Sequence, residues 1–188
     1  MYKRQKTYLI LIASLFFSFN IFAQSDDDAF DLSFEFQAYP TGLIPGIRIE
    51  KGFAEQHAIH LRLGYNWIRH QSRGVHEDER GDGFGFTLGY KKYFGSSFSG
   101  LFTGGKCDVW WNTLDWKDNI DLPSEISGTT KITVLQPTFE LGYLFLFNET
   151  WTLAPSIAFG YEVNIKTEGA NVGEGAILLI GFNIGKRF

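Results

Sequence analysis

The chain has 188 residues, a formal net charge of −4 and a single cysteine, Cys107. This length suits one domain, the lone cysteine excludes an internal disulfide, and the acidic balance argues against a nucleic-acid partner. Aromatic residues make up 17% of the chain, with 19 phenylalanines, a content typical of proteins that carry aromatic girdles at a membrane surface.

Residues 1–23 predict a secretory signal peptide. Three basic residues within the first six precede the apolar run 9–23, and an abruptly polar segment follows it. The run is short for a membrane-spanning helix. With cleavage after Ala23, residues 24–188 form the mature domain, which is long enough for about eight strands of about 10 residues each.

The remaining chain alternates between apolar residues and polar or small ones, the period-two pattern of strands with two different faces. The third predicted strand shows it most clearly, with Ile59, Leu61 and Leu63 against His60 and Arg62. The expected strands are 31–38, 45–51, 57–69, 83–93, 101–112, 131–145, 151–164 and 176–188. An all-β domain follows.

The predicted connections alternate in length. Those after the second, fourth and sixth strands are short, whereas the segments 70–83, 113–130 and 165–175 are long and polar. The first turn, 39–42, is the short exception among the connections at that end. Barrels of bacterial outer membranes have short periplasmic turns and longer extracellular loops, so the long segments are expected outside the cell.

The last predicted strand ends on an aromatic residue, with apolar side chains at alternate positions before it. This pattern resembles the closing strand of Gram-negative outer-membrane β-barrels, although Lys186 stands where another apolar residue is common. The resemblance implies that Phe182, Ile184 and Phe188 form a signal read by the barrel-assembly machinery. It also implies that this strand pairs with the first one, which would leave no free sheet edge.

The second face of the strands carries small residues and charges of both signs. We expect it to line a narrow lumen filled by paired side chains, because buried charges persist when they are paired. The candidate lumen network is Glu35, Arg48, Glu50, His60, Arg62, Lys91, Lys106, Asp108, Glu140 and Glu162. The aromatic residues expected at the membrane interfaces are Trp67, Tyr93, Trp111, Trp151 and Tyr161.

One short motif suggests chemistry. His70-Gln71-Ser72 resembles the His-x-Ser pair of outer-membrane deacylases that act on lipid A. However, Arg73 replaces the asparagine of that family, no acidic partner is evident, and the strand parity turns His70 and Ser72 away from lipid. The acidic runs 76–82 and 115–121 lack the spacing of a calcium loop. No catalytic site, metal or cofactor is therefore predicted, although enzymatic activity stays open.

Together these patterns predict an eight-stranded antiparallel up-and-down transmembrane β-barrel, monomeric, in the cell outer membrane. The expected role is structural or adhesive, through the extracellular loops. The expected partners are outer-membrane lipid, the barrel-assembly machinery and a ligand of those loops. Three other functions remain open: a lipid A-modifying enzyme, a narrow channel, and a soluble secreted β-domain that binds a lipophilic ligand.

Overall fold

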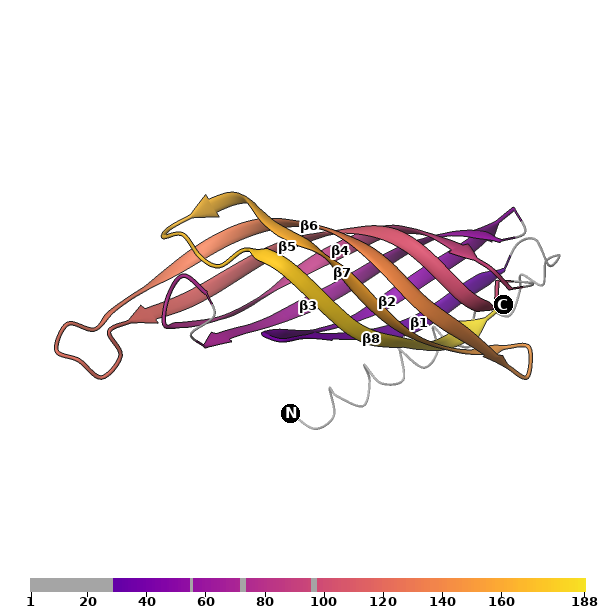
Figure 1. Ribbon diagram of the computed structural model, residues 1–188, viewed down its shortest axis with the longest axis horizontal. Coiled ribbons are helices and arrows are strands. Elements are labelled where there is room, and N and C mark those ends of the chain that lie inside the picture. Colours follow the sequence, from indigo (N-terminus) through magenta and orange to yellow (C-terminus); the bar gives the residue numbers. More distant parts are fainter. Residues whose placement is uncertain (1–28, 55, 72–73, 96–97) are drawn as a thin grey trace, which may run out of the picture.

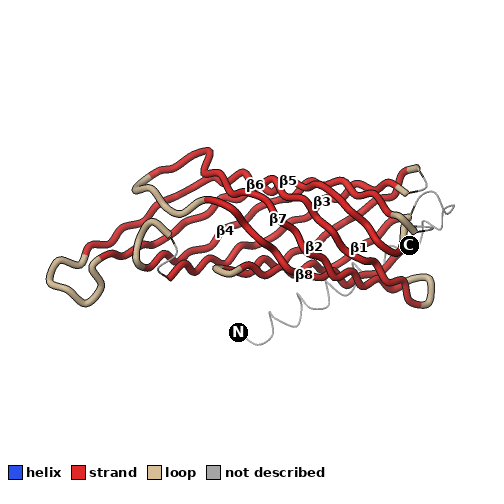
Figure 2. Tube along the Cα trace, viewed as in Figure 1, coloured by secondary structure: helices blue, strands red, loops and turns tan. Residues whose placement is uncertain are grey.

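The computed structural model describes residues 29–54, 56–71, 74–95 and 98–188. The predicted signal peptide and Ser72 lie outside the described residues. The strands are β1 (Phe30–Tyr39), β2 (Gly42–Phe53), β3 (His57–Gln71), β4 (Asp78–Tyr93), β5 (Gly100–Asp118), β6 (Ile126–Phe147), β7 (Trp151–Glu168) and β8 (Gly175–Arg187). Each strand pairs antiparallel with the next, and β8 pairs with β1 to close the barrel (Figures 1 and 2). The predicted fold class is confirmed.

The outside of the barrel is apolar and its inside is polar. On β3 the Leu63 side chain is 65% exposed, whereas its neighbour Arg62 is fully buried, and Phe84 on β4 is 72% exposed. A soluble barrel that binds a lipophilic ligand would have the reverse arrangement, so that alternative is wrong. Among the described residues no helix is long and apolar enough to cross a membrane, a finding that does not bear on crossing by strands.

The strands extend beyond the expected boundaries at one end of the barrel. Of the segments predicted to be loops, 70–83 and 113–130 are mostly strand, and 165–175 is strand at 165–168 and at 175. The connections there run over 72–77, 119–125 and 169–174. The sequence prediction ended these strands too early because polar and charged residues become frequent there. Polar side chains still allow ladder hydrogen bonds, and the register sets Asp78 opposite Lys117 and Arg80 opposite Asp115.

These extensions form one end of the barrel, called here the outer end. Together with the short β1–β2 turn it lies on the left in Figure 1, opposite the short turns and the C-terminus. The opposite end is called the short-turn end. The predicted alternation of short and long connections is only partly confirmed. The connections 54–56 and 148–150 are short, but 94–99 is as long as 72–77 and 169–174, and what distinguishes the outer end is the extension of its strands.

The seam between β8 and β1 is held by side chains as well as by the ladder. Arg187 donates to both carboxylate oxygens of Asp31, over 2.9 and 3.0 Å. The Phe36 and Phe182 rings lie 6.0 Å apart, and the Phe188 amide donates to the Phe30 carbonyl. Phe182 and Ile184 point outward, 42% and 49% exposed. Their role as an assembly signal stays a prediction.

Candidate functional site in the lumen and at the outer end

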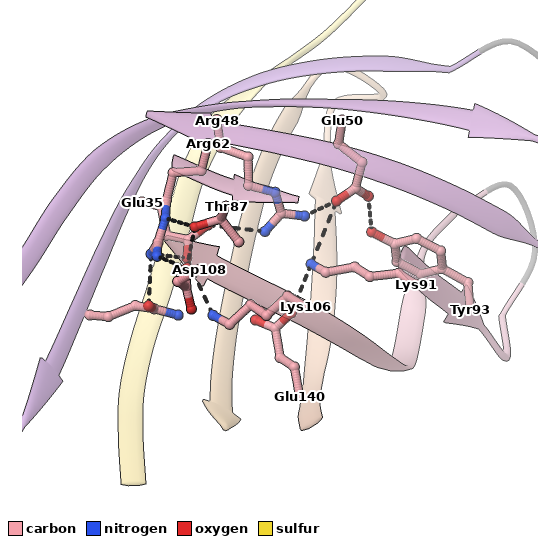
Figure 3. A network of polar contacts seen from close by, with 11 residues as sticks. Glu35, Arg48, Glu50, Arg62, Thr87, Lys91, Tyr93, Lys106, Asp108 and Glu140 are labelled. Atoms are coloured by element: carbon pink, nitrogen blue, oxygen red, sulfur yellow. Dashed lines mark hydrogen bonds and ion pairs between the residues drawn. The ribbon is translucent and has the colours of Figure 1, made fainter. Parts of the chain in front are cut away.

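The middle of the lumen contains a network of buried charges (Figure 3). Its members are the carboxylates Glu35, Glu50, Asp108 and Glu140 and the basic groups Arg48, Arg62, Lys91 and Lys106, none more than 5% exposed. The two signs are equal in number, so the network is neutral when all of its groups are charged. Strand alternation turns these residues, which were predicted from the sequence, to the inside, and the register of the strands brings them to one level of the lumen.

Arg62 lies at the centre of this network. Its terminal nitrogens donate to Glu35 over 2.7 Å, to Gln37 over 2.7 Å and to Asp108 over 2.6 Å. Its Nε donates to the Thr87 hydroxyl over 2.9 Å. These bonds to four other strand positions make Arg62 the group whose loss would leave the most buried polar atoms without partners.

A second group of charges lies around Glu50, nearer to the short-turn end. Arg48 bridges Glu50 and Glu35, and the Tyr93 hydroxyl donates to Glu50. The Lys91 ammonium lies 3.5 Å from Glu50, 3.8 Å from Glu140 and 3.8 Å from the centre of the Phe102 ring. Tyr93, predicted at the membrane interface, is instead fully buried inside the barrel. The prediction was wrong because Tyr93 has the parity of Lys91, which faces inward.

Buried apolar side chains lie in the lumen on both sides of the charges. Toward the outer end the buried cluster consists of Ile44, Ile68, Trp110, Leu114, Ile132, Val134, Ala158, Val172, Ile177 and Leu179. Toward the short-turn end it consists of Ala58, Tyr93, Phe98, Phe102, Leu144 and Ala154. The sequence analysis missed these two layers, since it took all inward positions as polar or small. The inward parity of Ile44, Trp110 and Phe102 was the available signal.

Two large side chains fit because glycines face them. A Cβ atom at Gly85 would overlap the Trp110 indole, and one at Gly52 would overlap the Phe98 ring. Phe98 comes from the β4–β5 connection and has a positive φ of 52°. Its carbonyl accepts a 2.9 Å hydrogen bond from Arg187, the residue that also closes the β1–β8 seam. A residue of a turn therefore packs inside the barrel, where strand alternation could not predict it.

Two residues of the predicted network lie apart from its bonded core. His60 is buried on the lumen face, and Gly89 lies directly against its ring. Glu162 is only half-buried and lies near the outer end, where it lines a pocket of about 310 Å³ together with His70 and Tyr39. Glu162 therefore lies on the predicted strand face, but beside residues of the outer end and not within the bonded charge network.

At the outer end, His76 joins three hairpins into what we call the clasp, formed by His76, Glu77, Asp118 and Asn171. The His76 ring lies 2.7 Å from the Asp118 carboxylate and 3.0 Å from the Asn171 carbonyl. It stacks on Trp116 with 4.1 Å between ring centres. Both ring nitrogens face oxygens that only accept, so a ring protonated on both nitrogens satisfies both partners.

Backbone hydrogen bonds complete the clasp. The Glu77 amide donates to Asp118 over 3.0 Å, and the Ile120 amide donates to the Glu77 carboxylate over 3.1 Å. Hydrogen bonds from His76 and from the Glu77 amide lower the pKa of Asp118 below its ordinary value. The clasp thus holds the β3–β4, β5–β6 and β7–β8 connections against one another.

The structure gives His70 the acidic partner that was not evident in the sequence. Its Nδ1 lies 2.9 Å from the buried Glu79 carboxylate, across the β3–β4 ladder. Burial raises the pKa of Glu79, but hydrogen bonds from His70 and from the His76 and Gly173 amides outweigh burial and lower it. Glu79 also accepts from the Val75 amide over 2.9 Å. The carboxylate therefore anchors loop backbone as well as the imidazole.

The acidic residues of the outer end do not gather into a metal site in the part of the chain that the structure describes. No group of three or more His, Cys, Asp or Glu side chains there has the geometry to hold an ion. Asp118 and Glu79 instead bind imidazoles and backbone amides, as described above.

No protein-family model and no curated protein matches the chain. Solved structures do. The outer-membrane protein AlkL in lipid bilayers is 14% identical, with a TM-score of 0.50 over 90% of this chain and 95% of that one. The N-terminal β-barrel domain of Pseudomonas aeruginosa OprF is 16% identical, with a TM-score of 0.48 over 85% and 97%. Neisserial surface protein A is 11% identical, with a TM-score of 0.47 over 86% and 96%.

At 14% identity, the likeness to AlkL concerns the fold and does not extend to activity. It agrees with the closed ring of eight strands and with the apolar exterior. The described chain has the fold of the small eight-stranded outer-membrane β-barrels.

Proposed function

We propose that the chain is an integral outer-membrane protein whose barrel is a sealed anchor and whose outer end acts at the cell surface, structurally or adhesively. The observation that supports this proposal is a buried apolar cluster on each side of a charge network whose signs balance. An interior of this kind offers no continuous polar path for ions or solutes.

The sealed lumen favours an anchor over a narrow channel. A conducting pore needs a hydrated path, usually with charges of one dominant sign along it. Here Arg62 and Lys91 lie against acids, and the fully buried Trp110 and Phe102 belong to the apolar clusters on either side. Opening such a lumen would require both layers to move.

The outer end supports a role at the surface. The clasp makes three connections into one body, and apolar side chains remain exposed on it: Val75 is 61% exposed, Leu122 is 56% exposed and Ile120 is 38% exposed. Exposed apolar side chains held on an ordered scaffold are typical of contact surfaces. These exposed side chains support the adhesive role.

Orientation can be tested with inserted tags. A tag at Pro123, at the tip of the β5–β6 connection, should bind antibody on intact cells. A matched tag at Glu149, in the β6–β7 turn at the short-turn end, should bind only after the outer membrane is opened. The reverse pattern of labelling would overturn the proposed orientation.

The adhesive role can be tested with a double variant, Val75→Ser with Leu122→Ser. Cells that express the wild type should be retained on at least one of a panel of protein-, glycan- and lipid-coated surfaces, and the double variant should lose that retention. Lys166→Gln, on the same end, is the control. If no coating retains wild-type cells above cells without the protein, the adhesive role is wrong. A structural role would then require that deleting the gene increases detergent sensitivity.

A further inference from the structure

Two arginines face each other on the outside of the barrel, just above its apolar band. The β3–β4 register sets Arg69 directly opposite Arg80. Both have the outward parity, and the Arg80 side chain is 57% exposed. Like charges directly opposite each other on neighbouring strands are destabilising, so this pair needs a compensating partner.

The two arginines are not equally provided with partners. Arg80 donates from Nε to Asp78 over 2.7 Å. Within the described ranges, no hydrogen bond or ion pair engages the Arg69 side chain; besides its place in the β3–β4 ladder, its backbone amide donates to the Thr41 carbonyl. Two further acids lie close to the pair, and both have partners of their own: Tyr65 is hydrogen-bonded to Asp82, and Thr129 donates to Asp115 over 2.6 Å.

The pair lies at the level of lipid headgroups. The outward residues of β3 are apolar as far as Trp67, which is 49% exposed, and Arg69 is the next outward residue. Two residues along a strand span roughly 7 Å, and tryptophan marks the boundary between hydrocarbon and headgroups. Arg69 and Arg80 line a shallow groove of about 910 Å³ that also includes Trp67 and Tyr39.

We propose that Arg69 and Arg80 bind one phosphate-type oxyanion between them, in this groove. Guanidinium groups recognise phosphate through paired, charge-assisted hydrogen bonds, and one oxyanion would offset the repulsion between them. The anion comes either from the headgroup of a phosphorylated lipid or from a free phosphate. The lipid source rests on the proposed membrane placement, whereas binding of a free anion does not.

The test uses the purified full-length protein and two probes. In the first arm, native mass spectrometry measures retention of phosphatidic acid against phosphatidylcholine in mixed micelles. In the second, calorimetry in detergent measures binding of inorganic phosphate. The variants are Arg69→Gln, Arg80→Gln and their double, each checked for folding by its heat-modifiable shift on a gel. Lys131→Gln is the matched control, because the residues directly opposite Lys131 on the two neighbouring strands are Thr113 and Glu168, neither of which is a cation.

We expect the double variant to lose roughly tenfold or more of the phosphatidic acid retention, as the loss of bidentate phosphate bonds implies, with Lys131→Gln unchanged. Arg69→Lys, which keeps the positive charge, should retain more phosphatidic acid than Arg69→Gln. If inorganic phosphate binds the wild type and not the double variant, the source is a free anion, and if it binds neither, the source is the lipid. Equal retention by the wild type and the double variant, or equal losses in the double variant and Lys131→Gln, would overturn the site.

Discussion

The lumen network and the clasp are built from the same kinds of hydrogen bonds between charged groups, but in different surroundings. Arg62 and Asp108 are both fully buried, whereas His76 and Asp118 have side chains that are 10% and 27% exposed. When a partner is removed inside the lumen, the other charge stays in a poorly hydrated space. When one is removed from the clasp, water replaces it. We therefore expect the ion pairs of the lumen to stabilise the whole fold, and those of the clasp only to order the connections at the outer end.

The largest effect is expected for Arg62→Leu. The substitution leaves Glu35 and Asp108 without their main partner, and breaking a buried ion pair costs on the order of 3–5 kcal/mol of unfolding free energy. Urea unfolding in lipid vesicles measures it. Thr138→Val is the control, because the buried Thr138 hydroxyl has no partner among the described residues and its loss should be neutral or stabilising. If the two variants are equally stable, the lumen charges are solvated.

A smaller loss is expected for Phe98→Ala, which removes the turn residue that plugs the short-turn end. Burial of a phenylalanine side chain contributes about 1.5–3 kcal/mol of transfer free energy, which the variant loses. The same urea titration measures the resulting fall in unfolding free energy. Phe94→Ala, in the same connection but 56% exposed, should change stability little. Equal effects of the two substitutions would show that Phe98 does not pack in the lumen.

The clasp should respond locally and to pH. His76→Ala should accelerate amide exchange of Glu77 and Ile120 several-fold and leave global unfolding almost unchanged. Because the folded pKa of Asp118 is lowered, its stabilising contribution is present above the unfolded pKa of about 3.9 and is lost as pH falls through the lower folded value. NMR signals of the Glu77 amide should therefore shift below about pH 4. If neither His76→Ala nor the lower pH alters the Glu77 amide, the clasp does not join the three connections.

The smallest effect is expected for Lys117→Gln. Lys117 lies 3.1 Å from Glu125, but its side chain is 54% exposed, and exposed pairs contribute little. The urea midpoint should match that of the wild type within error. A clear loss of stability would show that the outer end contributes to the global fold.

Strand number, closure and the inward parity of charges such as Arg62 and Glu140 could be predicted from the sequence, because a two-residue period determines the face of every side chain in a strand. The residues at which the strands end could not be predicted in this way. Ladder hydrogen bonds form between backbones whatever the side chains are, so β5 continues to Asp118 through residues that the pattern assigned to a loop.

The pairing of residues was also beyond sequence reasoning. Which base meets which acid depends on the stagger between strands that are not neighbours, as with Arg62 on β3 and Asp108 on β5. Phe98 and Val172 lie in connections, where no period predicts that they point into the lumen. The partner of His70 lies nine residues later in the chain, on the adjacent strand, and only the β3–β4 register brings the two together.

The central claim is that the lumen is sealed, and the most direct measurement is the ionic conductance of the purified, folded wild-type protein in planar lipid bilayers. The account predicts no steady conductance above that of the bare bilayer, because apolar layers close the lumen on both sides of a neutral charge network. Reproducible, long-lived open states in the wild type would contradict it and would make the protein a channel.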